Sequence, residues 1–361
     1  MTELIERPPA SVGIDPAGLD RAVRLIAERG AAAQVCLLRE GRVVLDRVFG
    51  CRPDSLFWIF SASKPYVAMA VHLLAQRGDL TLDDPVARYW PEFGQRGKDG
   101  ITVRHVLQHR AGLPVAHSVI GDGAAMTNWR RAVRLIERAT PTSPPGGAPS
   151  YHLLTYGFIL GELVARVTGV GIRDFLATEI LAPLVLTDTH LGIDAADFAR
   201  STPIRATGRA GRVKELAFNR RQVRTAIIPA AGISTTAREL AHFYQSLLDA
   251  ERGANAVFTA ATIAEARRPS SDDELDQRLG TRVRWAQGFQ LGGPTAGTGH
   301  GRAMGRLSST LAFGHNGSKC CIGWADPTRQ LAFAYVTDLL PAAGGRGHQR
   351  DVADALLAAC G

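Results

Sequence analysis

Hydrophobic and polar positions recur along the chain with periods that change at recognisable turn residues. A helix-period pattern over residues 15–30 predicts a first helix, which Asp15 can cap and Gly30 can end. Two β-rich runs, 32–40 and 42–50, follow it around a short turn and predict a hairpin.

Helical periods dominate the middle of the chain. An apolar helix is predicted to start near Ser61 and to end at Gly78. Further helical runs, separated by Pro/Gly loops, span 102–113, 127–139, 156–169 and 172–184. The remaining pattern predicts a helix over 235–250 capped by Thr235 or Thr236, strands in 281–292, 309–317, 319–327 and 330–338, and a last helix over 348–360.

This order of elements predicts an α+β fold. It lacks the alternation of strand and helix that builds a doubly wound parallel sheet. We expect an antiparallel β-sheet flanked by helices from both chain ends, plus an inserted all-helical lobe. The sheet domain would combine residues 1–83 and 216–361, the lobe would span 84–215, and an active site would lie in the cleft between them.

The composition is typical of a folded globular protein and argues against nucleic-acid-binding and membrane proteins. The 361 residues are 45% hydrophobic and 21% charged, and the net charge of +8 is spread along the chain without basic runs interleaved with aromatics. We therefore expect no nucleic-acid partner. The five cysteines show no C-x-x-C spacing, and the neighbours Cys320 and Cys321 would point to opposite faces of a strand, which predicts reduced thiols. With no apolar run near 18 residues and no signal core, we expect no membrane span and a cytoplasmic location.

One tetrapeptide, Ser61-Ala62-Ser63-Lys64, carries candidate chemistry. Pro65 places it at the start of a helix, where exposed N–H groups favour a developing anion. Lys64 follows Ser61 by one turn on the same face. Only four of the 42 basic residues are lysines, and a lysine, unlike an arginine, can lose its proton when buried. The alternative is a serine cap beside a surface lysine, because S-x-x-K also occurs by chance.

The region around this tetrapeptide resembles a known family. Residues 60–93, "FSASKPYVAMAVHLLAQRGDLTLDDPVARYWPEF", resemble the nucleophile helix and following segment of the serine β-lactamase and penicillin-binding-protein superfamily. The nearest likeness is to its class C-like branch, which includes the family VIII carboxylesterases and related transacylases. The resemblance continues in order through 101–114, 145–169, 228–243 and 313–327, and it covers roughly residues 15–340. It implies a β-lactamase/transpeptidase-like fold.

The resemblance implies a catalytic role for Tyr151. In the family, a Y-x-N tyrosine works with the lysine as general base, and a neighbouring cation such as Lys64 would help a phenol to ionise. The motif here reads Tyr151-His152-Leu153, with Leu153 at the asparagine position that helps β-lactamases to hold the antibiotic's amide. Leu153 thus favours esters over lactams. By itself Tyr151 could instead be an interface residue, and Tyr156, inside a helix, is a second candidate.

A second implied part of the site is His315-Asn316-Gly317, which stands where the family has K-T-G or H-x-G. The resemblance implies that His315, Asn316 and Gly317 contact substrate. It also implies that the Ser318 backbone N–H forms an oxyanion hole with that of Ser61. The alternative is a simple turn at the end of a strand, since Asn-Gly is a strong turn signal.

Two other patterns are weaker. His105 and His109 are four residues apart, but no H-E-x-x-H pattern accompanies them, so ordinary helix histidines are favoured over a metal site. The glycine-rich run 292–301 lacks the lysine of a phosphate-binding P-loop. No G-x-S-x-G is present, which argues against an α/β-hydrolase.

Together these features predict a serine carboxylesterase acting on a small ester, or amide, with short acyl chains through an acyl-enzyme on Ser61. No cofactor or metal is expected, and the oligomeric state is open. One alternative is a transacylase of secondary metabolism, in which an alcohol or amine takes the acyl group. The others are a β-lactamase or D-amino-acid peptidase, and a non-catalytic binding relative.

Overall fold

The main architectural feature is a six-stranded antiparallel sheet. In the computed structural model, which describes residues 6–272, 274–293, 303–341 and 347–360, the strand order is β2-β1-β12-β11-β10-β9. The strands are β1 (Ala33–Arg39), β2 (Arg42–Phe49), β9 (Gln290–Leu291), β10 (Phe313–Gly317), β11 (Cys321–Asp326) and β12 (Leu331–Thr337). Every neighbouring pair in it is antiparallel. The predicted α+β class is confirmed, with the N-terminal hairpin joined to the C-terminal meander by the β1–β12 pair.

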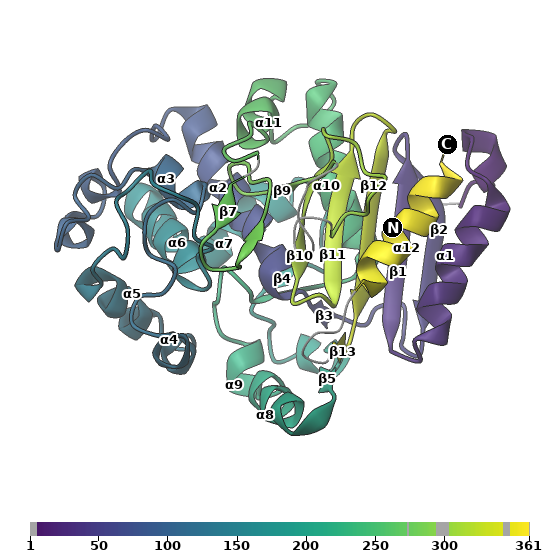
Figure 1. Cartoon of the computed structure of the whole chain (residues 1–361), viewed down its shortest axis with the longest axis horizontal. Coiled ribbons are helices and arrows are strands. Elements are labelled where there is room, and N and C mark those ends of the chain that lie inside the picture. The colour runs from purple at the N-terminus through teal and green to yellow at the C-terminus, as the bar shows by residue number, and fades with distance from the viewer. Residues whose placement is uncertain (1–5, 273, 294–302, 342–346, 361) are drawn as a thin grey trace.

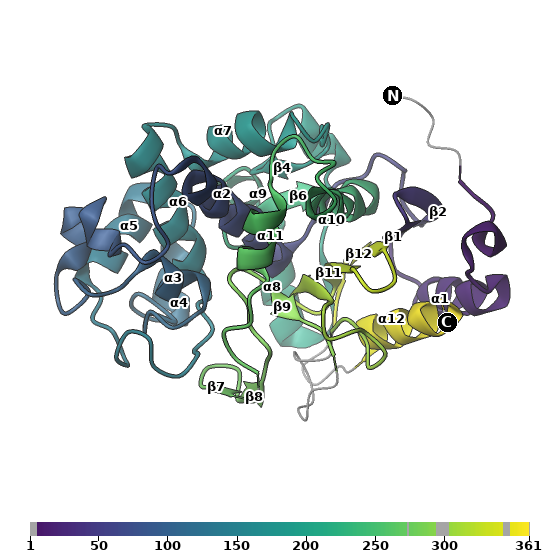
Figure 2. The ribbon, with the colours of Figure 1, turned by 90° about the horizontal axis from the view of Figure 1, so that it is seen from above.

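Helices from both chain ends cover the sheet. On one face α1 (Pro16–Glu28) and α12 (His348–Ala359) pack against each other and against the sheet, and α10 (Ala237–Glu251) packs on the opposite face (Figures 1 and 2). Because both faces are covered, β11 and β12 are buried at every position, and their apolar runs lack a polar face. The Asp15 carboxylate caps α1 by accepting the amides of Ala17 and Gly18, as predicted.

Helix α2 (Lys64–Arg77) lies between the sheet and a helical region. It begins after the 3₁₀ turn Phe60–Ser63 and ends at Gly78, whose φ of +79° is the predicted left-handed stop. The helical region contains α3 (Val103–Leu107), α4 (Val119–Ala125), α5 (Trp129–Arg138), α6 (Thr155–Thr168) and α7 (Ile172–Leu176) with a π-helical extension Ala177–Leu181, whereas α8 (Gly208–Phe218) lies apart from it, next to β5 (Arg205–Ala206) (Figure 1). Figure 1 shows this region beside α2, away from the sheet.

Three sequence-based expectations differ from the structure. Segment 84–215 is not purely helical, because β4 (His190–Leu191) and β5 (Arg205–Ala206) pair with β6 (Ile233–Thr235) and β13 (Leu339–Leu340) outside the main sheet. The helix expected over 102–113 stops at Leu107, since His109 adopts a φ of +59°. The strand expected over 281–292 is interrupted, with Gly288 at a φ of +115°. The domain boundaries stay predictions, and α8 runs across the second of them.

The remaining described elements are short connections. They are the strands β3 (Phe57–Trp58), β7 (Leu275–Asp276) and β8 (Thr281–Arg282), the helices α9 (Arg221–Arg224) and α11 (Ala260–Ala266), and the 3₁₀ turns Pro9–Val12, Val86–Arg88, Pro91–Gly94 and Asp197–Arg200. Among the helices that the structure describes, none is long and apolar enough to cross a membrane.

Candidate active site

The chain around Ser61 is packed so that this one residue stays accessible. From residue 55 to residue 74 every residue is buried except Ser61, which is partly exposed at the 3₁₀ turn before α2. The neighbouring Ser63 is fully buried, and its Oγ accepts a hydrogen bond from the Ile233 backbone amide at 3.1 Å. The two serines of the motif are therefore distinguished, since only Ser61 presents its hydroxyl to a ligand.

Lys64 is buried with its amine directed at Ser61. Its Nζ lies 3.4 Å from the Ser61 Oγ and donates to the backbone carbonyls of Leu153, at 2.9 Å, and Ala230, at 3.3 Å. Burial lowers the pKa of Lys64 to about 7, because a charged ammonium loses its hydration there. The three acceptors are dipoles without net charge. A sizeable neutral fraction of the amine is thus available near neutral pH, next to a hydroxyl.

Tyr151 borders the same pair. The Lys64 Nζ lies 4.7 Å from the centroid of the Tyr151 ring, and Trp285 stacks on that ring with centroids 5.5 Å apart and planes 11° apart. Burial raises the pKa of Tyr151 well above its usual range; a hydrogen bond with Ser61 opposes this rise, and the Asp276 charge adds to it. The phenol is therefore held in its protonated form, beside a lysine whose pKa is low.

The end of strand β10 lies against the 3₁₀ turn that carries Ser61. A Cβ on Gly317 would stand 1.9 Å from the Ile59 carbonyl oxygen, so only glycine allows this approach. Ser318, with φ +47°, and Lys319, with φ +60°, form the tight turn into β11. The turn thus occurs after Gly317 and not at Asn316-Gly317, which belong to the strand.

His315 and Asn316 lie on β10 beside the aromatic cluster. The His315 ring centroid is 6.1 Å from those of both Tyr151 and Trp285, and its Nδ1 lies 2.7 Å from the Asn316 carbonyl. The Asn316 side chain donates to Gln290 Oε1 at 3.1 Å, which joins it to the edge strand β9. Their contact with substrate remains a prediction.

Leu153 enters the site mainly through its backbone. Its carbonyl accepts from Lys64, and its amide donates to the Pro114 carbonyl at 3.1 Å. The half-buried side chain packs on the cluster of Tyr151 and Trp285. Because any residue supplies a carbonyl, sequence reasoning had no signal for this contact.

Two neutral histidines, His109 and His152, lie beside Tyr151, and sequence reasoning gave neither of them a place in the site. The expectation of a helix histidine is wrong for His109, which follows the end of α3 at Leu107. The His109 ring lies 4.8 Å from the rings of both Tyr151 and Tyr156, and its Nδ1 accepts the His152 amide at 3.1 Å. Burial lowers the pKa of His109 strongly and that of His152 to about 3, so both rings stay uncharged. His105 is apart from them, with Nδ1 accepting the Thr102 amide in the cap of α3.

Metal ligation finds no support in the part of the chain that the structure describes. That part contains no group of three or more His, Cys, Asp or Glu residues able to hold a metal ion. Most of the glycine-rich run 292–301 lies outside the described residues. Cys320 lies in the turn before β11, and its Sγ is 3.8 Å from that of Cys321, so the expectation of opposite strand faces is wrong; both are free thiols.

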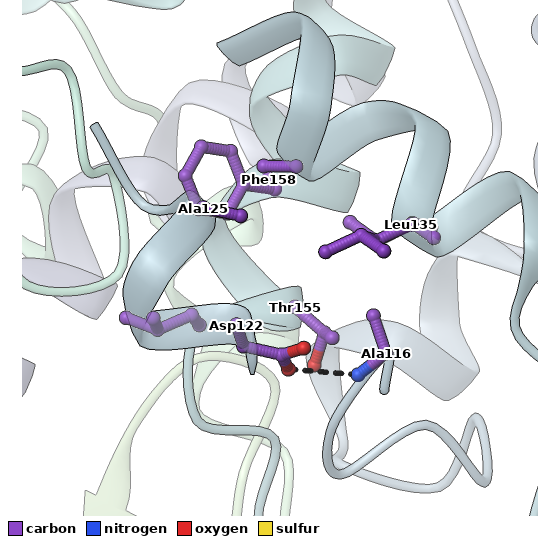
Figure 3. Close-up of a pocket in the computed structure, with 9 residues that line it drawn as sticks. Ala116, Asp122, Ala125, Leu135, Thr155 and Phe158 are labelled. Atoms are coloured by element: carbon purple, nitrogen blue, oxygen red, sulfur yellow. Dashed lines mark hydrogen bonds between the residues drawn. The ribbon is translucent and has the colours of Figure 1, made fainter. Parts of the chain in front are cut away.

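A small apolar hollow adjoins the segment that follows Leu153. Its lining is shown in Figure 3 and comprises Ala116, Asp122, Ala125, Ala132, Leu135, Ile136, Leu154, Thr155 and Phe158. The Asp122 carboxylate accepts the amides of Ala116, at 2.8 Å, and His117, at 3.0 Å, which ties α4 to the preceding loop. The hollow thus lies within the helical region, behind the turn whose carbonyl holds Lys64.

Comparison with known proteins identifies the family. The sheet with its helical region has the same fold as a crystal structure of a family VIII carboxylesterase, with a TM-score of 0.84, 24% identity and coverage of 98% of both chains. The chain belongs to the family described as Beta-lactamase, which it matches over residues 19–357.

Named relatives within this family include esterases. "Esterase/beta-lactamase LipL" of Mycobacterium tuberculosis is 29% identical over 80% of this chain and 70% of its own length. "Esterase EstB" of Burkholderia gladioli is 34% identical over 46% of each chain. The structure of EstA from Arthrobacter nitroguajacolicus Rue61a has a TM-score of 0.80 at 28% identity, over 96% of this chain and 97% of that one.

Proposed function

We propose that this protein is a serine esterase that forms an acyl-enzyme on Ser61. The observation that carries the proposal is the buried Lys64 amine, with a pKa of about 7, placed 3.4 Å from the hydroxyl of an accessible serine at a helix start. Relatives named as esterases support ester substrates, and so does leucine at position 153.

The first half-reaction transfers the acyl group to the serine. Neutral Lys64 takes the Ser61 proton while Oγ bonds to the ester carbonyl carbon. The carbonyl oxygen becomes an oxyanion, for which the backbone amides of Ser61 and Ser318 are the proposed donors. Collapse of this intermediate breaks the bond to the leaving alkoxide, which takes a proton from Lys64 through the Tyr151 hydroxyl.

The second half-reaction restores the enzyme. Water gives a proton to the same lysine and attacks the acyl carbonyl, and the carboxylic acid leaves as Ser61 recovers its proton. Tyr151 therefore acts as a protonated relay. This assignment differs from the expected phenolate, because burial raises the pKa of Tyr151 and lowers that of Lys64.

Turnover of p-nitrophenyl esters with short to long acyl chains tests the proposal. We expect wild type to hydrolyse short chains, and Ser61→Ala and Lys64→Arg to lose the activity. Ser63→Ala is the matched control on the same turn, and we expect it to keep an active site, because Ser63 binds backbone only. A Ser61→Ala variant with normal rates would overturn the proposal.

Two added measurements separate the alternatives. Product analysis with alcohols or amines present distinguishes water from another acceptor, and ester as the main product would identify a transacylase. Nitrocefin turnover tests the β-lactamase alternative, because the relative LipL is named both an esterase and a beta-lactamase. We expect slow or no nitrocefin turnover, since Leu153 offers no side-chain amide.

A further inference from the structure

A β-hairpin outside the main sheet folds over the loop that carries Tyr151. The hairpin includes β7 and β8 and lies between the helical region and strand β9 (Figure 2). The Gln277 amide donates to the Pro149 carbonyl at 2.9 Å, and the Tyr151 amide donates to the Asp276 carboxylate at 3.1 Å. The hairpin is thus joined to the loop on both sides of Ser150.

Asp276 is the centre of this junction. Its side chain is fully buried and accepts four N–H donors. Oδ1 accepts from Tyr151, Arg278 and Leu279, at 3.1, 3.0 and 2.9 Å, and Oδ2 accepts from the indole Nε1 of Trp285 at 3.1 Å. A buried carboxylate is costly unless donors of this kind surround it, so its position is closely determined.

The same carboxylate orients the ring that stacks on Tyr151. Trp285 is held through its indole by Asp276 and through its backbone amide by Ser271 Oγ at 3.1 Å. Its ring lies nearly parallel to the Tyr151 phenol, with planes 11° apart. Asp276 therefore fixes Tyr151 in two ways. It accepts the Tyr151 backbone amide directly, and it orients the Trp285 ring that stacks on the Tyr151 ring.

We infer that Asp276 is a positioning residue, which sets where the Tyr151 hydroxyl stands relative to Ser61 through the Tyr151 backbone and the Trp285 indole. This inference rests on the proposed esterase function. It assigns the β7–β8 hairpin a task in catalysis, which acts through the contacts of Asp276 with Tyr151 and Trp285. A displacement of a proton-relaying hydroxyl by about 1 Å can slow a reaction about 100-fold.

Steady-state kinetics on a short p-nitrophenyl ester test the inference with graded substitutions. Asp276→Asn keeps an oxygen for the three backbone amides but brings an amide group against the Trp285 N–H, and we expect kcat to fall about 10-fold. Asp276→Ala removes every acceptor, and we expect a fall of about 100-fold. KM should stay within about threefold in both, since the inferred role concerns the position of the Tyr151 hydroxyl in the transition state.

Asp272→Asn is the matched control on the same hairpin. Asp272 is exposed and pairs with Arg284, with 73% of its side-chain surface accessible, so we expect wild-type kcat. Trp285→Phe keeps a stacking ring but removes the indole donor. In that background Asp276→Asn should cost less than in wild type, because the opposed N–H is gone.

The possible results distinguish a failure of the proposed esterase function from a failure of the positioning role alone. A wild type without esterase activity would refute the proposed function itself. An active wild type with kcat within twofold in Asp276→Asn and Asp276→Ala would refute the positioning role alone. Circular dichroism melting checks folding, and if Asp276→Ala does not fold, Asp276→Asn and the double variant with Trp285→Phe still decide. Additive losses in that cycle would also contradict the inference.

Discussion

Two buried lysines of this chain differ in what their amines contact. Lys98 and Lys64 are both fully buried, and burial lowers their pKa values to about 8 and about 7. Lys98 uses its three donors on the carbonyls of Gln95, Glu137 and Ala139, and so fastens a loop to the end of α5. Lys64 instead directs one donor at a serine hydroxyl. The rarity of lysine in the chain therefore does not distinguish Lys64 from Lys98, whereas the serine hydroxyl that Lys64 faces does.

The first prediction concerns the pH dependence of catalysis. In the proposed mechanism Lys64 is neutral when it accepts the Ser61 proton, so kcat/KM should be low in acid, rise through a pH of about 7 and level off above it. The profile of p-nitrophenyl ester hydrolysis, corrected for the uncatalysed rate, measures this inflection. An inflection near the ordinary lysine pKa would contradict the low value.

The second prediction concerns stability and uses Lys64→Met, which is similar in shape but cannot titrate. Between about pH 7 and 10 the unfolded chain binds a proton at Lys64 that the folded chain does not, since burial lowers the folded pKa to about 7. The unfolding free energy of wild type should therefore rise with pH relative to the variant. The expected slope is about 1.4 kcal/mol per pH unit.

Urea unfolding of both proteins at several pH values measures this difference. Other titrating groups are shared and largely cancel. Below about pH 7 the difference should level off, because both states are then protonated at Lys64. A difference independent of pH between 7 and 10 would mean that the buried amine keeps its ordinary pKa.

At the level of elements, the close contact between β10 and the 3₁₀ turn that carries Ser61 explains why residue 317 is a glycine. Gly317→Ala would push a methyl group into the Ile59 carbonyl and separate the strand from the turn. We expect the variant to fold with about 1–3 kcal/mol less stability and to lose most of its esterase kcat, because the backbone amides of Ser61 and Ser318 would move apart.

Gly100→Ala is the control for this substitution. Gly100 has no heavy atom within 4 Å of the position of an added Cβ, so we expect normal activity and stability. Thermal unfolding and ester turnover of both variants check the prediction. A Gly317→Ala enzyme with wild-type kcat would show that the close approach of β10 is not needed.

Patterns local in sequence were sufficient for some elements and insufficient for others. The caps Asp15 and Gly78 and the apolar runs of β11 and β12 carry their own signal, and the sequence predicted them closely. The hairpin with β7 and β8 does not, because its two-residue strands are too short for a period to be visible. Its role comes from contacts across more than a hundred residues, as between Asp276 and Tyr151.

In the candidate site too, some groups were predictable from the sequence and others were not. Ser61, Lys64 and Tyr151 were found because motifs in the chain mark them, and the structure places them together. The Leu153 and Ala230 carbonyls that hold Lys64 carry no residue-specific signal. Equally, a lowered lysine pKa depends on burial, which only the assembled fold determines.

For the whole molecule, the helices at the two chain ends, α1 and α12, pack against each other. Asp15 donates its amide to the Ala359 carbonyl at 2.8 Å, and a Cβ on Gly18 would lie 2.7 Å from the Ala359 Cβ. This close approach of α1 and α12 covers the face of the sheet opposite α10 (Figure 2). The arrangement separates a part of the molecule that stabilises the sheet from the part that holds the candidate site.

The last prediction follows from this separation. Gly18→Val should force α1 away from α12 and lower the thermal unfolding midpoint, with an overpacking cost of about 1–3 kcal/mol. At 25 °C, where the variant stays folded, its esterase kcat and KM should match wild type, since β10, α2 and the β7–β8 hairpin keep their contacts. Asp20→Ala, on the exposed side of the same helix, is the control and should change neither quantity. A kcat loss in folded Gly18→Val would show that the two parts are coupled through the sheet.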